Sequence, residues 1–101
     1  MEFLLDLNIS EITIELLDDI YSDVEKEEII TCQNEITSSI KYLRNIGIKD
    51  NVIEEILIDD YHFLTPGEFY LKKAVSKVDQ KSLVIALNEN LDYAFYLKDF
   101  L

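Results

Sequence analysis

The chain has 101 residues, the size of one ordinary domain, and 49% of them are apolar, so it can bury a core without disulfides or metals. Its 21 Asp and Glu against nine Lys and Arg give a formal net charge of −12. Nucleic-acid binders gain most of their affinity by neutralising phosphates with basic side chains, so this charge argues against direct binding to DNA or RNA. We expect a single domain over residues 1–101.

The acidity is concentrated in the first part of the chain. Residues 1–60 hold sixteen acids and four bases, a net charge of −12, whereas residues 61–101 hold five of each. Such an excess has two interpretations. It is either a solvated outer face that keeps the protein soluble or a surface that attracts a basic partner.

The N-terminal residues and the cysteine content predict a cytoplasmic protein without a membrane segment. Residues 1–6 lack the basic and long apolar stretches of a signal peptide, and the apolar run at residues 83–87 is too short to span a bilayer. The single cysteine, Cys32, excludes an internal disulfide and fits a reducing compartment.

The hydrophobic periodicity is helical almost throughout. Two glycines and one proline are too few for the repeated turns of an all-β fold. We therefore expect an all-α fold, a compact bundle of five or six short helices. Residues 1–9 form either a short helix or an extended N-terminal arm laid on the core.

The first clear helix begins after Ser10, a favoured N-cap residue. Its spacing predicts a buried face made of Ile12, Leu16, Leu17, Ile20 and Tyr21. The opposite face carries the acidic side chains Glu11, Glu15, Asp18 and Asp19.

A second and longer helix is predicted from Ser22 to Gly47. Ser22 and Glu25 are spaced as a capping box, and Gly47 can supply the left-handed residue that ends a helix. The buried stripe consists of Ile29, Cys32, Ile36, Ile40 and Leu43. The first two turns carry Asp23, Glu25, Glu27 and Glu28. The helix dipole favours negative charge there, which explains part of the acidic excess without any partner.

Three further helices follow in the second half. The first is capped by Asp50, runs to Asp60 and buries Val52, Ile53, Ile56 and Leu57, with Tyr61 as a further candidate for the buried face. The next begins at a second capping box, Thr65-Pro66-Gly67-Glu68, runs to about Lys77 and packs through Phe69, Leu71, Ala74, Val75 and Val78. Asp79 caps the third, which carries Leu83, Val84, Leu87 and Leu91. Residues 93–101 are either a terminal helix or the end of that one.

Residues 11–21 and 51–61 share an internal similarity forty residues apart. Glu15, Leu17, Asp19 and Tyr21 recur as Glu55, Leu57, Asp59 and Tyr61. A period of this length is typical of helical-repeat proteins, but a shared amphipathic pattern produces the same match. The sequence leaves both explanations open.

Residues that could carry out chemistry are few. His62 follows Asp59 and Asp60, and Cys32 with His62 is the sole candidate nucleophile and base pair. No metal-ligand spacing and no glycine-rich phosphate loop is present. We expect a surface histidine and a structural thiol, with no catalytic, cofactor-binding or metal-binding residues, in a protein that is not an enzyme.

Two aromatic groups are candidates for either core or interface. One surrounds the Pro66-Gly67 turn and contains Tyr61, Phe63, Phe69 and Tyr70. The other lies at the C-terminus and contains Tyr93, Phe95, Tyr96 and Phe100. Tyrosines beside carboxylates suit a surface that binds a basic protein.

The function that these patterns favour is protein binding. We expect a small acidic protein-binding module, an inhibitor or immunity-type protein that occupies a basic, nucleic-acid-binding surface of another protein and acts there as a polyanion mimic. The expected contact residues are Glu11, Glu15, Asp18, Asp19, Asp23, Glu25, Glu27, Glu28, Asp59, Asp60, Tyr61, Tyr93 and Tyr96. The alternative is a structural or regulatory helical module that self-associates through its C-terminal aromatic residues, with an acidity that serves only solubility.

Overall fold

Helices joined by short connections make up the described part of the chain. A computed structural model describes residues 1–89, in which there is no strand. The α-helices are α1 (Glu2–Asp6), α2 (Glu11–Ile20), α3 (Asp23–Thr31), α4 (Gln33–Asn45), α5 (Asp50–Asp60), α6 (Glu68–Val75) and α7 (Gln80–Glu89), with a 3₁₀ turn, η1 (Tyr61–Phe63), after α5. The all-α prediction is confirmed, but residues 1–89 form seven helices rather than five or six.

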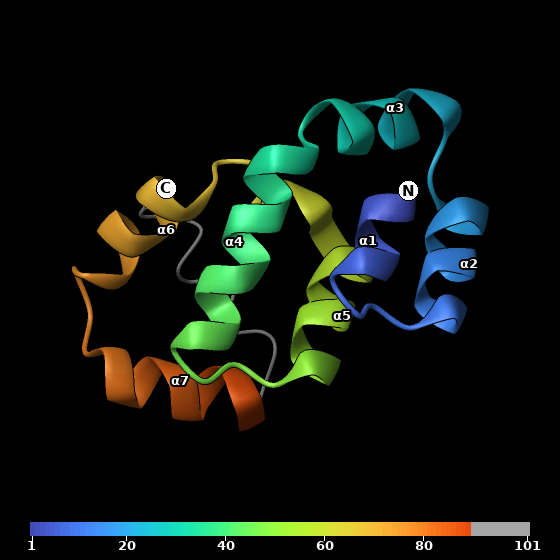
Figure 1. Ribbon diagram of the computed structural model, residues 1–101. Helices are drawn as coiled ribbons and strands as arrows, with labels where there is room; N and C mark the ends of the chain where they lie inside the picture. The colour runs from blue at the N-terminus through green and yellow to red at the C-terminus, as the bar shows by residue number, and fades with distance from the viewer. Residues whose placement is uncertain (90–101) are drawn as a thin grey trace.

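The central helices are α4 and α5. Figure 1 places α1, α2 and α3 on one side of them and α6 and α7 on the other, and α4 contacts α1, α3, α5 and α6. All seven helices contribute at least one side chain with no solvent exposure to the core, and these include Leu4, Leu17, Ile29, Ile40, Ile53, Leu71 and Leu87. Burial of such side chains is the main force that holds short helices together, since isolated helices of this length are marginal in water.

The first nine residues contain a helix, which decides between the two alternatives left open by their sequence. Helix α1 ends at Asp6, and Asn8 then adopts a left-handed backbone conformation with φ of +62°. Asparagine tolerates this conformation better than most residues. The turn directs Ile9, which is buried, back onto the core.

The long helix predicted over residues 22–47 is divided at Cys32. The capping box at Ser22 and Glu25 forms as predicted. Helix α3 ends at Thr31, and Cys32, with a φ of −93° and a ψ of +18°, is both the C-cap of α3 and the N-cap of α4. The apolar stripe continues across this break, with Ile29 and Ile36 both fully buried. Periodicity alone therefore did not reveal the change of direction.

The predicted capping box at residues 65–68 does not form, and α6 begins later. Helix α6 starts at Glu68 after Gly67, whose φ is +89° and ψ is 172°, and it ends at Val75. The hydroxyl of Thr65 donates to the carbonyl oxygen of His62 instead (2.9 Å). The backbone N–H of Glu68 donates to Ser38 Oγ of α4 (3.0 Å), so a side chain from another helix takes the role that was expected of Thr65.

Helices α2 and α5, which carry the internal similarity, run side by side in the same direction. The N–H of Ser10 before α2 donates to Glu54 Oε1 of α5 (2.7 Å). At the other end, the rings of Tyr21 and Tyr61 meet edge to face, with centroids 5.0 Å apart. The two tyrosines that match in sequence therefore touch in the fold.

Candidate interaction surface

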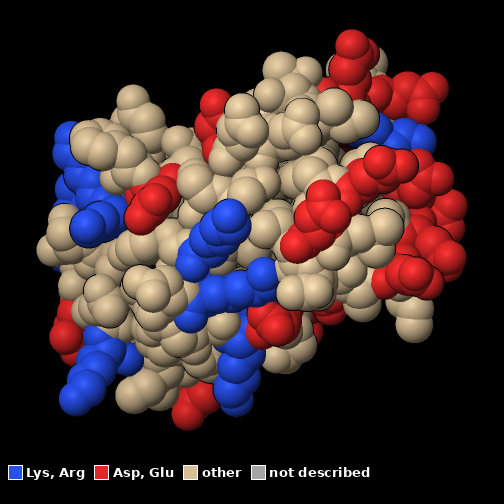
Figure 2. Space-filling model, in the orientation of Figure 1, with Lys and Arg blue, Asp and Glu red and all other residues tan. Residues whose placement is uncertain are grey.

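The acidic residues of α2 and α3 gather at one end of the molecule. Seven of the eight predicted contact residues in these two helices, all except the half-buried Glu25, are exposed. Figure 2 shows acidic side chains over the side formed by α2 and α3, where Lys26 is the one base of residues 11–31, whereas most Lys and Arg side chains in this view lie toward α4, α6 and α7. Residues 11–31 contain eight acids and one base, a net charge of −7.

Some of these acids have structural roles. Glu25 Oε1 accepts a hydrogen bond from the N–H of Ser22 (3.0 Å), which lowers the pKa of Glu25 below its usual value. Lys26 lies 3.2 Å from an Asp18 oxygen and 3.4 Å from Asp23, and its hydrogen bond to Asp18 raises the pKa of the ammonium group. These three carboxylates therefore stabilise the α2–α3 junction.

Four carboxylates are left available for a partner. Within residues 1–89, no hydrogen bond or ion pair engages the side chains of Glu11, Glu15, Asp19 and Glu27. All four are exposed. Unpaired carboxylates at the surface keep their full charge for interactions with another molecule.

The exposed side of α2 also carries apolar side chains, which the sequence did not predict. Ile12, Leu16 and Ile20 are 72%, 42% and 49% exposed, whereas the helix buries Thr13 and Leu17. The expectation that all three pack into the core is wrong, because the apolar part of α2 is wider than the surface that α1 and α5 cover. We call Ile12, Leu16 and Ile20, with the neighbouring Glu15 and Asp19, the α2 outer face.

The equivalent positions of α5 are covered. Val52 and Ile56, which match Ile12 and Leu16 forty residues earlier, are both buried. Helix α5 contacts both α2 and α4, so it has neighbours on more than one side. The same residue pattern is therefore core in α5 and surface in α2.

A second acidic group is joined to α3 through His62. Its Nε2 lies 2.9 Å from Glu28 Oε1 and its Nδ1 lies 3.0 Å from Asp60 Oδ1. The ring stacks on Tyr61, with centroids 4.2 Å apart. His62 thus links Glu28 of α3 to Asp60 at the end of α5, and Asp59 beside it is exposed.

The remaining predicted contact residues are tyrosines. Tyr61 is buried, and this burial raises its pKa, as does a hydrogen bond with Glu28. Its ring therefore lies beneath the acidic surface rather than on it. Tyr93 and Tyr96 lie outside the described residues, as does the predicted self-association through the C-terminal aromatic group.

The aromatic group around the Pro66-Gly67 turn is divided between core and surface. Phe63 is buried like Tyr61. In contrast, Phe69 and Tyr70 of α6 are 71% and 54% exposed and meet edge to face at 5.3 Å. The prediction that Phe69 packs inward is wrong, because α6 turns Leu71, Ala74 and Val75 toward the core.

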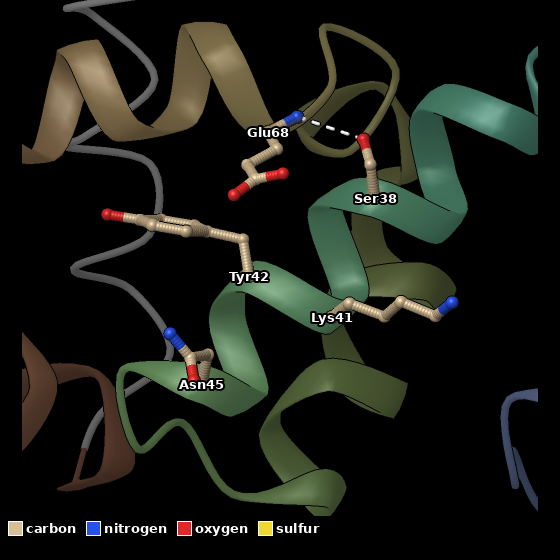
Figure 3. A pocket seen from close by; sticks show the side chains of 5 residues that line it. All are labelled: Ser38, Lys41, Tyr42, Asn45 and Glu68. Atoms are coloured by element: carbon tan, nitrogen blue, oxygen red, sulfur yellow. Dashed lines mark hydrogen bonds between the residues drawn. The ribbon is translucent and has the colours of Figure 1, made fainter.

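Two shallow pockets lie beside α4 and α6, and no sequence signal pointed to them. The first, shown in Figure 3, has a volume of about 340 Å³ and is lined by Ser38, Lys41, Tyr42, Asn45 and Glu68. Its neighbour, of about 350 Å³, shares Tyr42, Asn45 and Glu68. The carboxylate of Glu68 points into the space above Tyr42 (Figure 3).

Two other kinds of feature are absent from residues 1–89. Residues 1–89 contain no group of three His, Cys, Asp or Glu side chains placed to hold a metal ion. None of their helices combines the length and the apolar character that crossing a bilayer requires. Comparison of the chain with family models, curated proteins and solved structures found no match.

Proposed function

We propose that the chain is a protein-binding module that uses the acidic surface of α2 and α3 to occupy a basic surface of a target protein. The observation that carries this proposal is the set of four exposed carboxylates, Glu11, Glu15, Asp19 and Glu27, that have no partner within residues 1–89. Complementary charge speeds the encounter of two proteins and suppresses binding to wrong partners.

An inhibitor or immunity-type role follows from the same surface. A target whose basic surface binds nucleic acid would meet carboxylates where it otherwise meets phosphates, and the module would then act as a polyanion mimic. Ile12, Leu16 and Ile20 add apolar area to this contact. Acids that only imitate phosphates need no such area, so we infer that the target presents apolar side chains among its basic ones.

The proposal is tested by charge reversal at two matched sets of positions. One variant changes the four unpaired acids, Glu11, Glu15, Asp19 and Glu27, to Lys. The control variant changes the same number of exposed acids elsewhere, namely Glu2, Asp6, Glu35 and Glu55. Both variants carry the same net charge, so any difference between them reports the position of the acids rather than their number.

The measurement is affinity capture from a lysate of the source cells with each immobilised chain. We expect the wild type and the control variant to retain the same specific partner, and the α2–α3 variant to lose it. Equal capture by the two variants would mean that the α2–α3 surface does not bind the partner.

A further inference from the structure

The α2 outer face is an apolar helix surface that no described element covers. Ile12, Leu16 and Ile20 recur every four residues, so they form one stripe about 12 Å long on the helix. Glu15 and Asp19, which are exposed and unpaired within residues 1–89, lie along this stripe. A segment that covers it must bring apolar side chains together with positive charge.

Helix α6 of the same chain has this composition on its exposed side. Phe69 and Tyr70 are mostly exposed, and Lys72 and Lys73 beside them are exposed as well. We call these four residues the α6 outer face. Helices α2 and α6 lie at opposite ends of the molecule, with α4 and α5 between them (Figure 1). One copy of the chain therefore cannot bring its own two faces together.

We propose that a second copy of this chain docks its α6 outer face onto the α2 outer face. Phe69 and Tyr70 of one copy would cover the stripe of Ile12, Leu16 and Ile20 on the other. The ammonium groups of Lys72 and Lys73 would reach Glu15 and Asp19, while their aliphatic stems cover apolar surface. Both the apolar contact and the charge pairing come from residues of this chain.

The contact joins two different surfaces, so it is heterologous. After the first contact, one copy keeps an unused α2 face and the other keeps an unused α6 face, which leads to a closed ring or an open chain rather than a two-fold dimer. One helix on one helix buries less than about 1,200 Å², the range of weak and reversible association. The net charge of −12 on each copy opposes the contact. At physiological ionic strength, screening with a Debye length of about 8 Å reduces the repulsion between distant charges more than the attraction between touching ones.

Self-association of this kind competes with the proposed target for α2. A target would release single copies from the assembly as it binds. The inference nevertheless stands apart from the proposed function, because a chain can self-associate without a target and can bind a target as a monomer.

The test is sedimentation velocity of the full chain from about 10 μM to about 1 mM at about 0.15 M salt, where a weak helix contact becomes populated. We expect the mean mass of the wild type to rise with concentration. The variants E15K/D19K and K72E/K73E should each remain monomeric. The control E55K/D59K changes the same residue types at the same spacing on the exposed side of α5, and it should associate like the wild type.

An equimolar mixture of E15K/D19K and K72E/K73E gives the sharpest result. Every contact between the two different variants again joins opposite charges, so we expect association to return. The two variants carry net charges of −8 and −16, so attraction between overall charges does not explain such a rescue. Leu16→Gln should weaken wild-type association at least several-fold, whereas Ile85→Gln, at an apolar position of α7 that is 58% exposed, should not.

Several results would overturn the inference. These are a wild type that is monomeric over the whole range, association that survives both double reversals, an equal loss in E55K/D59K, and a mixture that stays monomeric. Circular dichroism of each variant checks that the helices are retained. A monomeric chain that still captures a target through α2 would support the proposed function while removing this inference.

Discussion

At the scale of single residues, Tyr21 joins α2 to α5. Its hydroxyl donates to the carbonyl oxygens of Leu57 (2.5 Å) and Ile58 (2.9 Å) near the C-terminal end of α5, and its ring packs on Tyr61. Helix carbonyls at this end have no partner within the helix, so the hydroxyl satisfies groups that would otherwise need water. Burial raises the pKa of Tyr21 to about 12.

We expect Tyr21→Phe to lower the free energy of unfolding by about 1 kcal/mol at neutral pH, the usual net value of a hydrogen bond. The folded pKa lies above the unfolded value of 10.0. The contribution of the neutral hydroxyl is therefore complete below pH 10 and is lost as the pH rises toward 12. Urea unfolding of the wild type and the variant at pH 7 and pH 11 measures this. A stability difference that does not shrink at the higher pH would contradict it.

Gly67 determines where α6 begins. Its φ of +89° with ψ of 172° lies in a region that is essentially restricted to glycine. A Cβ atom there would have ordinary contacts, with Ser38 Oγ at 3.5 Å, so the obstacle to substitution is the backbone conformation rather than space.

We expect Gly67→Ala to destabilise the protein by about 1–3 kcal/mol. The control is Ser76→Ala, at an exposed residue at the other end of α6, which should lower the stability less. Urea unfolding compares the two. A variant at Gly67 with wild-type stability would mean that α6 starts with a different backbone conformation.

At the scale of helices, a comparison of α2 with α5 shows which features follow from the sequence pattern and which follow from the neighbouring helices. Both segments have apolar residues at helical spacing and a matching Leu, Leu17 and Leu57, that is fully buried. Ile12 and Leu16 are nevertheless exposed, whereas Val52 and Ile56 are buried. Periodicity identifies the helix and its apolar side, but the width of the covered strip depends on how many helices pack against it.

Adjacent leucines of α2 provide a direct test of this assignment. Leu17→Ala removes a fully buried side chain and should cost about 2–5 kcal/mol. Leu16→Ala, one position earlier on the exposed side, should change stability by about 0.5 kcal/mol or less. Denaturant unfolding of both variants measures the two losses of stability. Similar losses would place Leu16 in the core, and the α2 outer face would not exist.

Other elements show where sequence reasoning succeeded and where it failed. The all-α class, the helix over residues 50–60, its buried side chains and the Ser22–Glu25 capping box were all predictable, because these signals are local. The division at Cys32 was not, since the apolar stripe continues through it. The start of α6 was not predictable either, because the N–H of Glu68 donates to the hydroxyl oxygen of Ser38, thirty residues earlier in the sequence.

The candidate surface was predicted only in part. The acidic residues of α2 and α3 are local in sequence and lie together as their positions suggested. The apolar stripe among them and the link from Glu28 through His62 to Asp60 depend on packing between helices. Tyr61 was a candidate for either core or interface and was included among the contact residues, and its burial depends on packing that the sequence pattern does not reveal.

At the scale of the whole molecule, charge is distributed unevenly between the two ends. Residues 11–31 carry a net charge of −7, whereas residues 68–89 contain four bases and three acids. The electrostatic potential is therefore most negative at the acidic end, an asymmetry that the total charge of −12 does not reveal. A basic target would be attracted to that end before contact.

We expect this asymmetry to appear as a salt-dependent association rate. Raising the ionic strength from about 0.05 M to about 0.5 M shortens the Debye length and should slow association with the target at least several-fold, with a smaller effect on dissociation. Stopped-flow mixing at both salt concentrations measures the two rates. An association rate that is independent of salt would contradict electrostatic steering.

The most direct measurement compares the affinity of the captured target for E15K/D19K and for E2K/D6K by titration calorimetry. The two variants change identical residue types at identical spacing and share the same net charge, and only the first lies on the α2 outer face. We predict that E15K/D19K binds at least tenfold more weakly, about 1.4 kcal/mol, while E2K/D6K binds like the wild type. Equal affinities would contradict the claim that α2 is the binding surface.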